Sequence, residues 1–515
     1  MKKSLSKRLV FGTPTGWAGL YGFFLLTFFI LWVPSTGYSS IVLPKHRLWV
    51  GATGLFLLGL VPLVLLQRRA GRLDFGRWSV QDRLPLCLAA GLLVLFCLSA
   101  AASSYPSVVW LGNRRHEGFL TLFLYLAVFS SMALWGKLRP AHAIGAALST
   151  FLICALVLVQ FFGYNPLGLY PEGLGFHDRG LRYSGEYLGT IGNSDLLSAC
   201  LTMLCLYLWG TYAVSGSRAR LWYLLSGGAA WFALLLSEVS AGPVAVLGCL
   251  ALCLPVCLAK GLGLRRMGEI GALLALGALG KSVLGYQYAD GVLTFFPSWG
   301  MKSWLFLAAA CLGLAAVVVL RRLPPGKAYP KAAWSLVLCY VILALAVLVM
   351  LYRYDGAHTT LQGLSQLLHG NPPSTLGSSR IAIWQEALHM GAEQPLLGGG
   401  PDTYQFRSSL IFTRELPSGQ IRRTSVDAAH CEYLNLWVNT GLPSMLLYVG
   451  LLASVLLPAV KHLRPGTLPL FLPALGYAIH ALFGISQSLV SPLFYLFLGA
   501  LAYANRQRPA KIRPQ

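Results

Sequence analysis

Two segments in the second half of the chain combine residue types that suit anion binding and proton transfer. The first reads SSRIAIWQEALHMGAEQPLLGGGPDTY (378–404), with Arg380 near its start. The second reads AAHCEYLNLWVNTGLPSMLLY (428–448) and contains His430 and Glu432. An Arg guanidinium pairs with phosphate oxygens in a bidentate manner. A His imidazole is the side chain best suited to accept a proton near neutral pH. These residues therefore predict a site that holds an anionic group and deprotonates a nucleophile, with Glu432 in support.

Other polar residues of the same and neighbouring segments are candidates for binding a substrate. Arg422 and Arg423 are adjacent, so one of the two is expected to face the site. Gly398 and Gly400 permit a backbone turn close to a bound group. The candidate binding residues are Arg422, Arg423, Arg182, Arg115, Asn193, Gly398, Gly400 and Tyr433.

The composition indicates which elements must position these residues. The 515 residues are 56% hydrophobic and 11% charged, whereas soluble domains carry about 25% charged residues. Apolar runs of about 20 residues recur, each long enough to cross a bilayer as a helix. Because the runs do not alternate apolar and polar residues, membrane strands are excluded and helices are favoured. We predict an all-α polytopic bundle of about fourteen transmembrane helices, at 17–33, 48–66, 84–102, 118–135, 141–162, 194–214, 221–237, 242–259, 269–287, 303–320, 333–351, 440–460, 467–485 and 488–505.

The placement of charge predicts the orientation of the bundle. The formal net charge is +23, but the basic residues lie in short loops between apolar runs, which argues against a nucleic-acid partner. Residues 67–83 contain five Arg, and residues 321–331 contain four Lys and Arg. Basic loops stay in the cytoplasm. We therefore predict a multi-pass protein of the cytoplasmic (inner) membrane, with both termini cytoplasmic.

This orientation predicts three regions along the chain. Residues 1–351 form eleven transmembrane helices with short loops, residues 352–440 form a long extracytoplasmic loop, and residues 441–515 form three more helices and a basic tail. Within the long loop, Ser378 and Ser379 are expected to cap a helix over 380–390. Its apolar stripe would comprise Ile381, Trp384 and Leu388, and the glycines at 398–400 would follow it.

The two segments together resemble the C-terminal signature of the O-antigen ligase and O-antigen polymerase family (the Wzy C-terminal region). That signature has an Arg-x-x-x-Trp helix, a Pro-Leu-Leu-Gly-x-Gly turn and a His-Asn-x-Tyr-Leu motif before a helix. The matching positions here are Arg380, Trp384, Pro395, Gly398, Gly400, His430, Glu432, Tyr433 and Leu434. Upstream, LGNRRHEGFLTLFLY (111–125) and GTIGNSDLLSACL (189–201) are similar to family segments beside outer loops.

The resemblance implies a membrane glycan transferase of lipopolysaccharide or cell-envelope polysaccharide biosynthesis. Such enzymes move a glycan from undecaprenyl pyrophosphate to a glycan or lipid acceptor, without a metal and with no cofactor. His430 would then take the proton of the acceptor hydroxyl, and Arg380 would hold the pyrophosphate. Two positions depart from the family pattern. Cys431 replaces the Asn that follows the His, and Ala241 stands where the family often has an Arg that is thought to bind pyrophosphate. Arg182, Lys281 and Arg115 are the candidates to replace that Arg.

Two other readings fit a polytopic chain. A flippase or transporter of polysaccharide or lipid carrier would require related halves and charges at the membrane midplane, and no such halves are apparent in the sequence. A peptidoglycan polymerase of the shape, elongation, division and sporulation type would rely on an outer-loop Asp, for which Asp402 and Asp427 are the nearby candidates.

Overall fold

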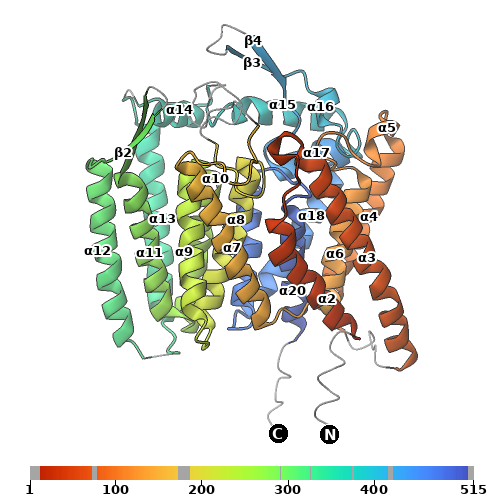
Figure 1. The fold of residues 1–515 in the computed structure, drawn as a ribbon, viewed down its shortest axis with the longest axis horizontal. Helices are drawn as coiled ribbons and strands as arrows, with labels where there is room; N and C mark the ends of the chain where they lie inside the picture. Colours follow the sequence, from red (N-terminus) through yellow and green to blue (C-terminus); the bar gives the residue numbers. More distant parts are fainter. Residues whose placement is uncertain are drawn as a thin grey trace.

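The computed structural model describes residues 12–71, 78–171, 186–289, 292–324, 326–356, 358–373, 376–415 and 421–507. Helices make up most of this part of the chain, and the long ones run side by side through one bundle (Figure 1). Two short antiparallel hairpins are the sheet structure that accompanies them. The predicted all-α polytopic class is confirmed.

Eight described helices are long and apolar enough to cross a membrane. The central one is α8, in which 89% of the apolar window is buried, whereas α13 at the edge of the bundle has none of its window buried. A central helix is held on all sides by its neighbours and can present a polar side chain in a fixed position. The eight are α3 (Val42–Arg69), α4 (Val80–Ala102), α7 (Pro140–Phe161), α8 (Ser194–Val214), α10 (Ala241–Lys260), α12 (Met301–Arg322), α13 (Pro330–Tyr352) and α18 (Leu442–Lys461).

Shorter or less apolar helices occupy the other predicted segments. Three are apolar but have fewer than 18 residues: α6 (Phe119–Trp135), α9 (Arg220–Leu236) and α19 (Leu468–His480). The rest are α2 (Pro14–Phe24) with its π-helical continuation η1 (Leu25–Phe29), α11 (Leu264–Val283) and α20 (Ser491–Arg506). Each of the fourteen predicted segments thus contains a helix.

Two predicted segments extend several residues beyond the end of the helix that the structure shows. The segment 269–287 does not stay helical, because strand β1 (Leu284–Ala289) begins directly after α11 and pairs with β2 (Val292–Pro297). Strand β2 has the sequence VLTFFP, and its β-branched and aromatic residues favour a strand. The segment 467–485 ends early, at His480. The carbonyl of Ala481, next in the chain, instead accepts a hydrogen bond of 2.8 Å from the backbone N–H of Glu432.

The end of the bundle where α20 finishes lies at the bottom of Figure 1. Several basic side chains make contacts at this end. They bind exposed carbonyls at helix ends, as cations there commonly do. Lys260 donates to the carbonyl of Lys461 at 2.7 Å, and Arg464 donates to that of Ala504 at 2.7 Å. Arg321 pairs with Glu269 at 2.8 Å. The cytoplasmic placement of this basic end remains a prediction from the positive-inside rule.

The opposite end of the bundle carries a layer of short elements that lie across the long helices (Figure 1). The layer has a small core of its own, in which the buried side chains include Ile383, Ala387, Met390 and Val438. Its principal helix, α15 (Arg380–Glu393), confirms the predicted helix over 380–390. The other elements at this end are η2 (Gly37–Ser40), α5 (Pro106–Val109), α14 (Thr359–Leu368), α16 (Tyr404–Arg407), α17 (Glu432–Thr440) and the hairpin of β3 (Ile411–Glu415) and β4 (Ile421–Ser425).

Two details predicted for α15 are wrong. Ser379 occupies the N-cap position but makes no side-chain capping bond, because its backbone is left-handed, with φ of 65°. The face of α15 that packs on the layer's core carries Ile383, Ala387 and Met390, whereas Leu388 of the predicted stripe is 45% exposed. The face with Arg380 and Trp384 is turned toward the polar residues described below.

The two ends of the bundle make the orientation testable by cysteine labelling. Ser409 follows α16 in the layer, Ser217 lies between α8 and α9 at the basic end, and both are exposed. With intact cells, a membrane-impermeant maleimide should label Ser409→Cys and leave Ser217→Cys unlabelled, with the wild-type chain as the background. Labelling of Ser217→Cys alone would place the basic end outside and refute the predicted orientation.

Candidate active site

The site is organised around Asp195, in the first turn of the central helix α8. Asn193 precedes it as the N-cap residue, and its side-chain oxygen accepts the N–H of Leu196 at 3.0 Å. This cap starts the helix sharply, so the Asp195 carboxylate stands at the helix N-terminus, where the helix dipole favours negative charge. The predicted binding residue Asn193 therefore fixes where Asp195 lies.

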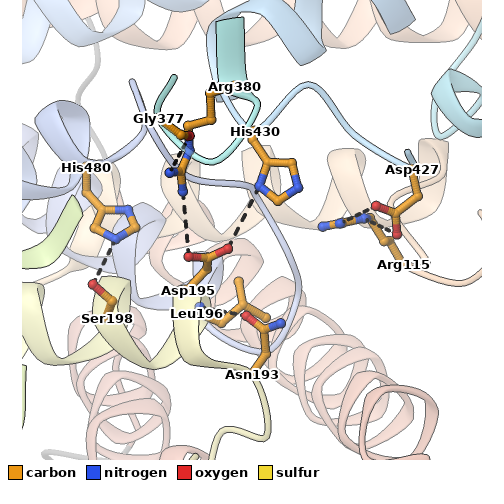
Figure 2. A network of polar contacts seen from close by, with 10 residues as sticks. All are labelled: Arg115, Asn193, Asp195, Leu196, Ser198, Gly377, Arg380, Asp427, His430 and His480. Carbon is orange, nitrogen blue, oxygen red and sulfur yellow. Dashed lines mark hydrogen bonds and ion pairs between the residues drawn. The ribbon is translucent and has the colours of Figure 1, made fainter. Parts of the chain in front are cut away.

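Two side chains from the covering layer reach down to the two oxygens of Asp195 (Figure 2). Arg380 Nη2 lies 3.9 Å from Asp195 Oδ1, and His430 Nδ1 lies 3.8 Å from Asp195 Oδ2. The three side chains are only 20–28% exposed. The Arg380 contact is a loose ion pair, the His430 contact is an ion pair only when the imidazole is protonated, and both are too long for direct hydrogen bonds. Catalytic hydrogen bonds are often this loose before substrate is bound.

His430 is held in an unusual backbone conformation just before α17. Its φ is 47°, in the left-handed region that residues other than glycine rarely adopt. Such conformations persist only where the surrounding structure enforces them, and they concentrate at functional sites. At His430 this backbone conformation directs the imidazole toward Asp195.

The surroundings of His430 favour its neutral form. Burial lowers the pKa of His430, Asp195 opposes that effect, and the Arg115 and Arg380 guanidiniums lower the pKa further. The result is a pKa below the ordinary value of a histidine. A neutral imidazole is available to accept a proton at neutral pH.

Arg380 is presented by three consecutive left-handed residues, Gly377, Ser378 and Ser379, with φ of 59–65°. Its guanidinium makes few strong contacts for its depth. Nη1 donates to the carbonyl of Gly377 at 3.4 Å, and the buried Nε has no hydrogen-bond partner among the described residues. A buried donor without an acceptor is unfavourable by about 1–3 kcal/mol. Arg380 therefore has spare capacity to bind an anion.

A second ion pair lies on the other side of His430 (Figure 2). The Arg115 guanidinium binds Asp427 with two hydrogen bonds, from Nε at 3.0 Å and from Nη2 at 2.6 Å. Burial would raise the pKa of Asp427, but the Arg115 charge and its hydrogen bonds outweigh burial and hold that pKa below its ordinary value. The predicted residue Arg115 thus joins the surroundings of His430, already paired with an acid.

The remaining sequence candidates lie elsewhere. Glu432 turns away from His430 and is buried against Tyr448 and Tyr477. The Tyr433 hydroxyl donates to the carbonyl of Ala478 at 2.8 Å. The side chain of Arg423 is exposed on β4, which projects beyond the layer in Figure 1. Arg422 is on the same strand, opposite Arg414. Arg182 lies outside the described residues.

The glycine turn packs against the end of α17. A Cβ on Gly398 would lie 2.6 Å from the carbonyl oxygen of Val438, and φ of Gly398 is 63°. The Gly400 N–H donates to the carbonyl of Asn439 at 2.8 Å. The closeness of these two backbones requires glycine at 398. The structure thus gives the run a packing role, and the predicted contact of Gly398 and Gly400 with a bound group stays a prediction.

Sequence reasoning missed Asp195 and the buried His480. His480 Nε2 lies 3.3 Å from Ser198 Oγ, one helical turn along α8 from Asp195 (Figure 2). The Asn-Ser-Asp start of α8 was a detectable helix-capping signal. Nothing local, however, relates Asp195 to residues that lie far from it in sequence. Among the described residues, no group of three His, Cys, Asp or Glu side chains is arranged to hold a metal ion.

Long apolar helices in one bundle, with an Arg–Asp–His cluster between the bundle and its covering layer, indicate a multi-pass membrane protein. Residues 298–449 match the model of the O-antigen ligase family (Wzy_C). This match supports the resemblance to that family that the motifs predicted. The matched segment contains Arg380 and His430. Comparison with curated proteins gives no match. The match supports a membrane glycan ligase or polymerase, a glycosyltransferase-like enzyme that acts on a lipid-linked glycan and a glycan acceptor.

The electrostatics of His430 can be tested without a substrate. Asp195 raises the pKa of His430 against the effect of burial, so Asp195→Asn should lower that pKa further. Diethyl pyrocarbonate modifies the neutral imidazole, and mass spectrometry of the His430 peptide gives the pH midpoint of the reaction. The wild-type midpoint should fall below that of a free histidine peptide, and Asp195→Asn should move it lower still. An unchanged or higher midpoint in the variant would remove Asp195 from the electrostatics of His430.

Proposed function

We propose that this protein transfers an oligo- or polysaccharide from undecaprenyl pyrophosphate to an acceptor hydroxyl at the outer face of the cytoplasmic membrane. The observation that carries the proposal is the cluster of His430, Asp195 and Arg380 in one polar site, in which the buried Nε of Arg380 has no hydrogen-bond partner among the described residues. His430 and Arg380 both come from the segment that matches the O-antigen ligase family.

His430 would act as the general base. As the acceptor oxygen attacks the anomeric carbon of the donor, its proton passes to the imidazole. The new glycosidic bond forms while the bond from the anomeric carbon to the phosphate oxygen breaks. The electron pair leaves with the polyprenyl pyrophosphate. Asp195, 3.8 Å from Nδ1, would stabilise the imidazolium that results. The same contact would orient the ring.

Arg380 would bind the leaving pyrophosphate. Its Nε is buried without a partner, and its charge lies within a poorly solvated site where electrostatic interactions are strong. The acid closest to it, Asp195, is shared with His430 and lies 3.9 Å away, so Arg380 is not committed to a tight ion pair. Arg115 is bound by Asp427 at 2.6 Å and would contribute long-range positive potential more than a direct contact. Positioning and leaving-group stabilisation would then supply most of the rate gain.

No residue in this proposal requires a metal, because the base is an imidazole and the counter-charge is a guanidinium. EDTA should therefore leave transfer unchanged.

Transfer in proteoliposomes tests the proposal, with polyprenyl-linked glycan as donor and matched amounts of protein. His430→Ala should reduce kcat by about 10²- to 10⁴-fold, the range typical of losing a general base. Arg380→Ala should lower kcat/KM for the donor by about 10- to 100-fold, with part of the loss in kcat, since hydrogen bonds to charged groups contribute about 1.5–3 kcal/mol.

Arg423→Ala is the matched control, because Arg423 is an exposed arginine of the same region on β4. It should transfer at the wild-type rate. Wild-type transfer by both His430→Ala and Arg380→Ala, with normal accumulation in the membrane, would refute this site. Transport of the lipid-linked glycan would then be the better interpretation.

A further inference from the structure

A second polar cluster is buried beneath α17, and the proposed chemistry does not use it. Its centre is formed by two carboxyl groups, Glu117 just before α6 and Glu432 at the start of α17, which are 9% and 7% exposed. Tyr125 Oη donates to Glu117 at 2.7 Å, and Tyr448 Oη donates to Glu432 at 2.6 Å. Charged groups this deep need full hydrogen bonding to be tolerated.

A continuous chain of hydroxyl groups joins the two carboxyls. Ser486 Oγ lies 2.9 Å from Glu117 Oε2 and 3.2 Å from Ser491 Oγ. Ser491 Oγ lies 3.1 Å from Tyr477 Oη, which lies 2.9 Å from Glu432 Oε2. The two contacts with the carboxyl groups have ordinary hydrogen-bond lengths, and the two between hydroxyl groups, at 3.1 and 3.2 Å, are longer.

If each contact in the chain is a hydrogen bond, the chain needs one proton more than its hydroxyls supply. It has four oxygen–oxygen contacts, between Glu117, Ser486, Ser491, Tyr477 and Glu432, but only three hydroxyl protons. If both carboxyls were ionised, one contact would join two oxygens with no proton between them. A single carboxylic proton on either glutamate satisfies all four contacts, with every bond pointing the same way along the chain.

The electrostatics agree with this count. Burial raises the pKa of Glu117 to about 8, against the opposing hydrogen bonds of Tyr125 and Ser486, and the charges of Asp402 and Glu432 raise it further. Burial also raises the pKa of Glu432, against the phenol groups of Tyr448 and Tyr477. The groups that face the pair are thus phenols and acids from α6, α17, α18, α19 and the turn at Asp402, together with Tyr495 of α20.

The same cluster fixes the backbone that carries His430. On one side of His430, the Ala429 N–H donates to Asn435 Oδ1 at 3.2 Å. On the other side, the Glu432 N–H donates to the carbonyl of Ala481 at 2.8 Å, and the Glu432 side chain enters the buried chain. Hydrogen bonds of the residues on both sides thus hold His430 in its left-handed conformation. A strained residue requires such support from its surroundings.

We propose that Glu117 and Glu432 are positioning residues, which share one buried proton and thereby hold His430 in its strained conformation beside Asp195. This inference rests on the proposed role of His430 as the base. The pair touches no substrate, and its effect on transfer acts through α17.

The shared proton predicts an alkaline limit to activity. A folded-state pKa raised above its unfolded value means that the folded protein holds the proton more tightly. The contribution to stability is therefore full below the ordinary value of 4.5 and is lost as the pH rises toward about 8. Above that, two carboxylates would repel each other in a site of low polarity, and the start of α17 would loosen.

Glu117→Gln tests the proposal, because an amide can both donate and accept in the chain and never ionises. At neutral pH the variant should keep most of the wild-type kcat with an unchanged KM, and its alkaline limb should move to higher pH or disappear. Glu393→Gln, on the exposed end of α15, is the matched control and should keep the wild-type profile.

A second readout is independent of transfer. Cys431 is buried between His430 and Glu432, so its alkylation by a small maleimide reports opening of the start of α17. At pH 9, Glu117→Gln should be alkylated more slowly than wild type, and the two should be alike at pH 6. Unchanged alkaline inactivation together with equal alkylation at pH 9 would overturn the shared-proton inference while leaving the proposed function intact. If His430→Ala retains transfer, the proposed function fails instead, and the alkylation comparison still decides whether the proton is shared.

Discussion

Asp195 joins parts of the chain that lie far apart in the sequence. It lies at the start of the central helix α8, and its two oxygens face Arg380 of α15 and His430 ahead of α17. Those two residues belong to a layer with its own small core. A carboxylate that attracts the Arg380 guanidinium helps to position that layer on the bundle. Because α8 is the most buried of the eight long apolar helices, Asp195 is also a rigid reference point.

The sequence predicted what depends on local pattern and missed what depends on distant partners. Apolar runs predicted each long helix, because a bilayer requires about 20 apolar residues for one crossing. The helix of α15 was predicted, but its buried face was not, since Ile381, Trp384 and Leu388 are spaced as well as the buried Ile383, Ala387 and Met390. Only the position of the bundle beneath α15 distinguishes the two faces. Asp195 and Glu117 were missed for the same reason: their partners lie far away in the sequence.

The two departures from the family pattern have local structural consequences. Ala241, where the family often has Arg, is 5% exposed at the start of α10. Its neighbour Gly242 packs directly on Ser198 and Thr202 of α8, so this end of α10 contributes contact with α8 where the family contributes charge. The cations that act on His430 are instead Arg115 and Arg380. Cys431, in place of Asn, is the N-cap residue of α17 and makes no side-chain capping bond. The start of α17 therefore depends on other anchors, namely the N–H and the side chain of Glu432.

That dependence gives a physical reason for burying two acids beside the site. An apolar core of the same volume would pack as well and would avoid the loss of solvation. It would not, however, specify one position for the first turn of α17, because dispersion contacts are not directional. A chain of hydrogen bonds that is completed by one shared proton has a single favourable geometry. Its hydrogen bonds are lost when any member of the chain moves. His430 adopts an unfavourable φ at the edge of a helix without a side-chain cap. Directional bonds are therefore what its position requires, and the phenols of α6, α18 and α19 supply them from within the bundle.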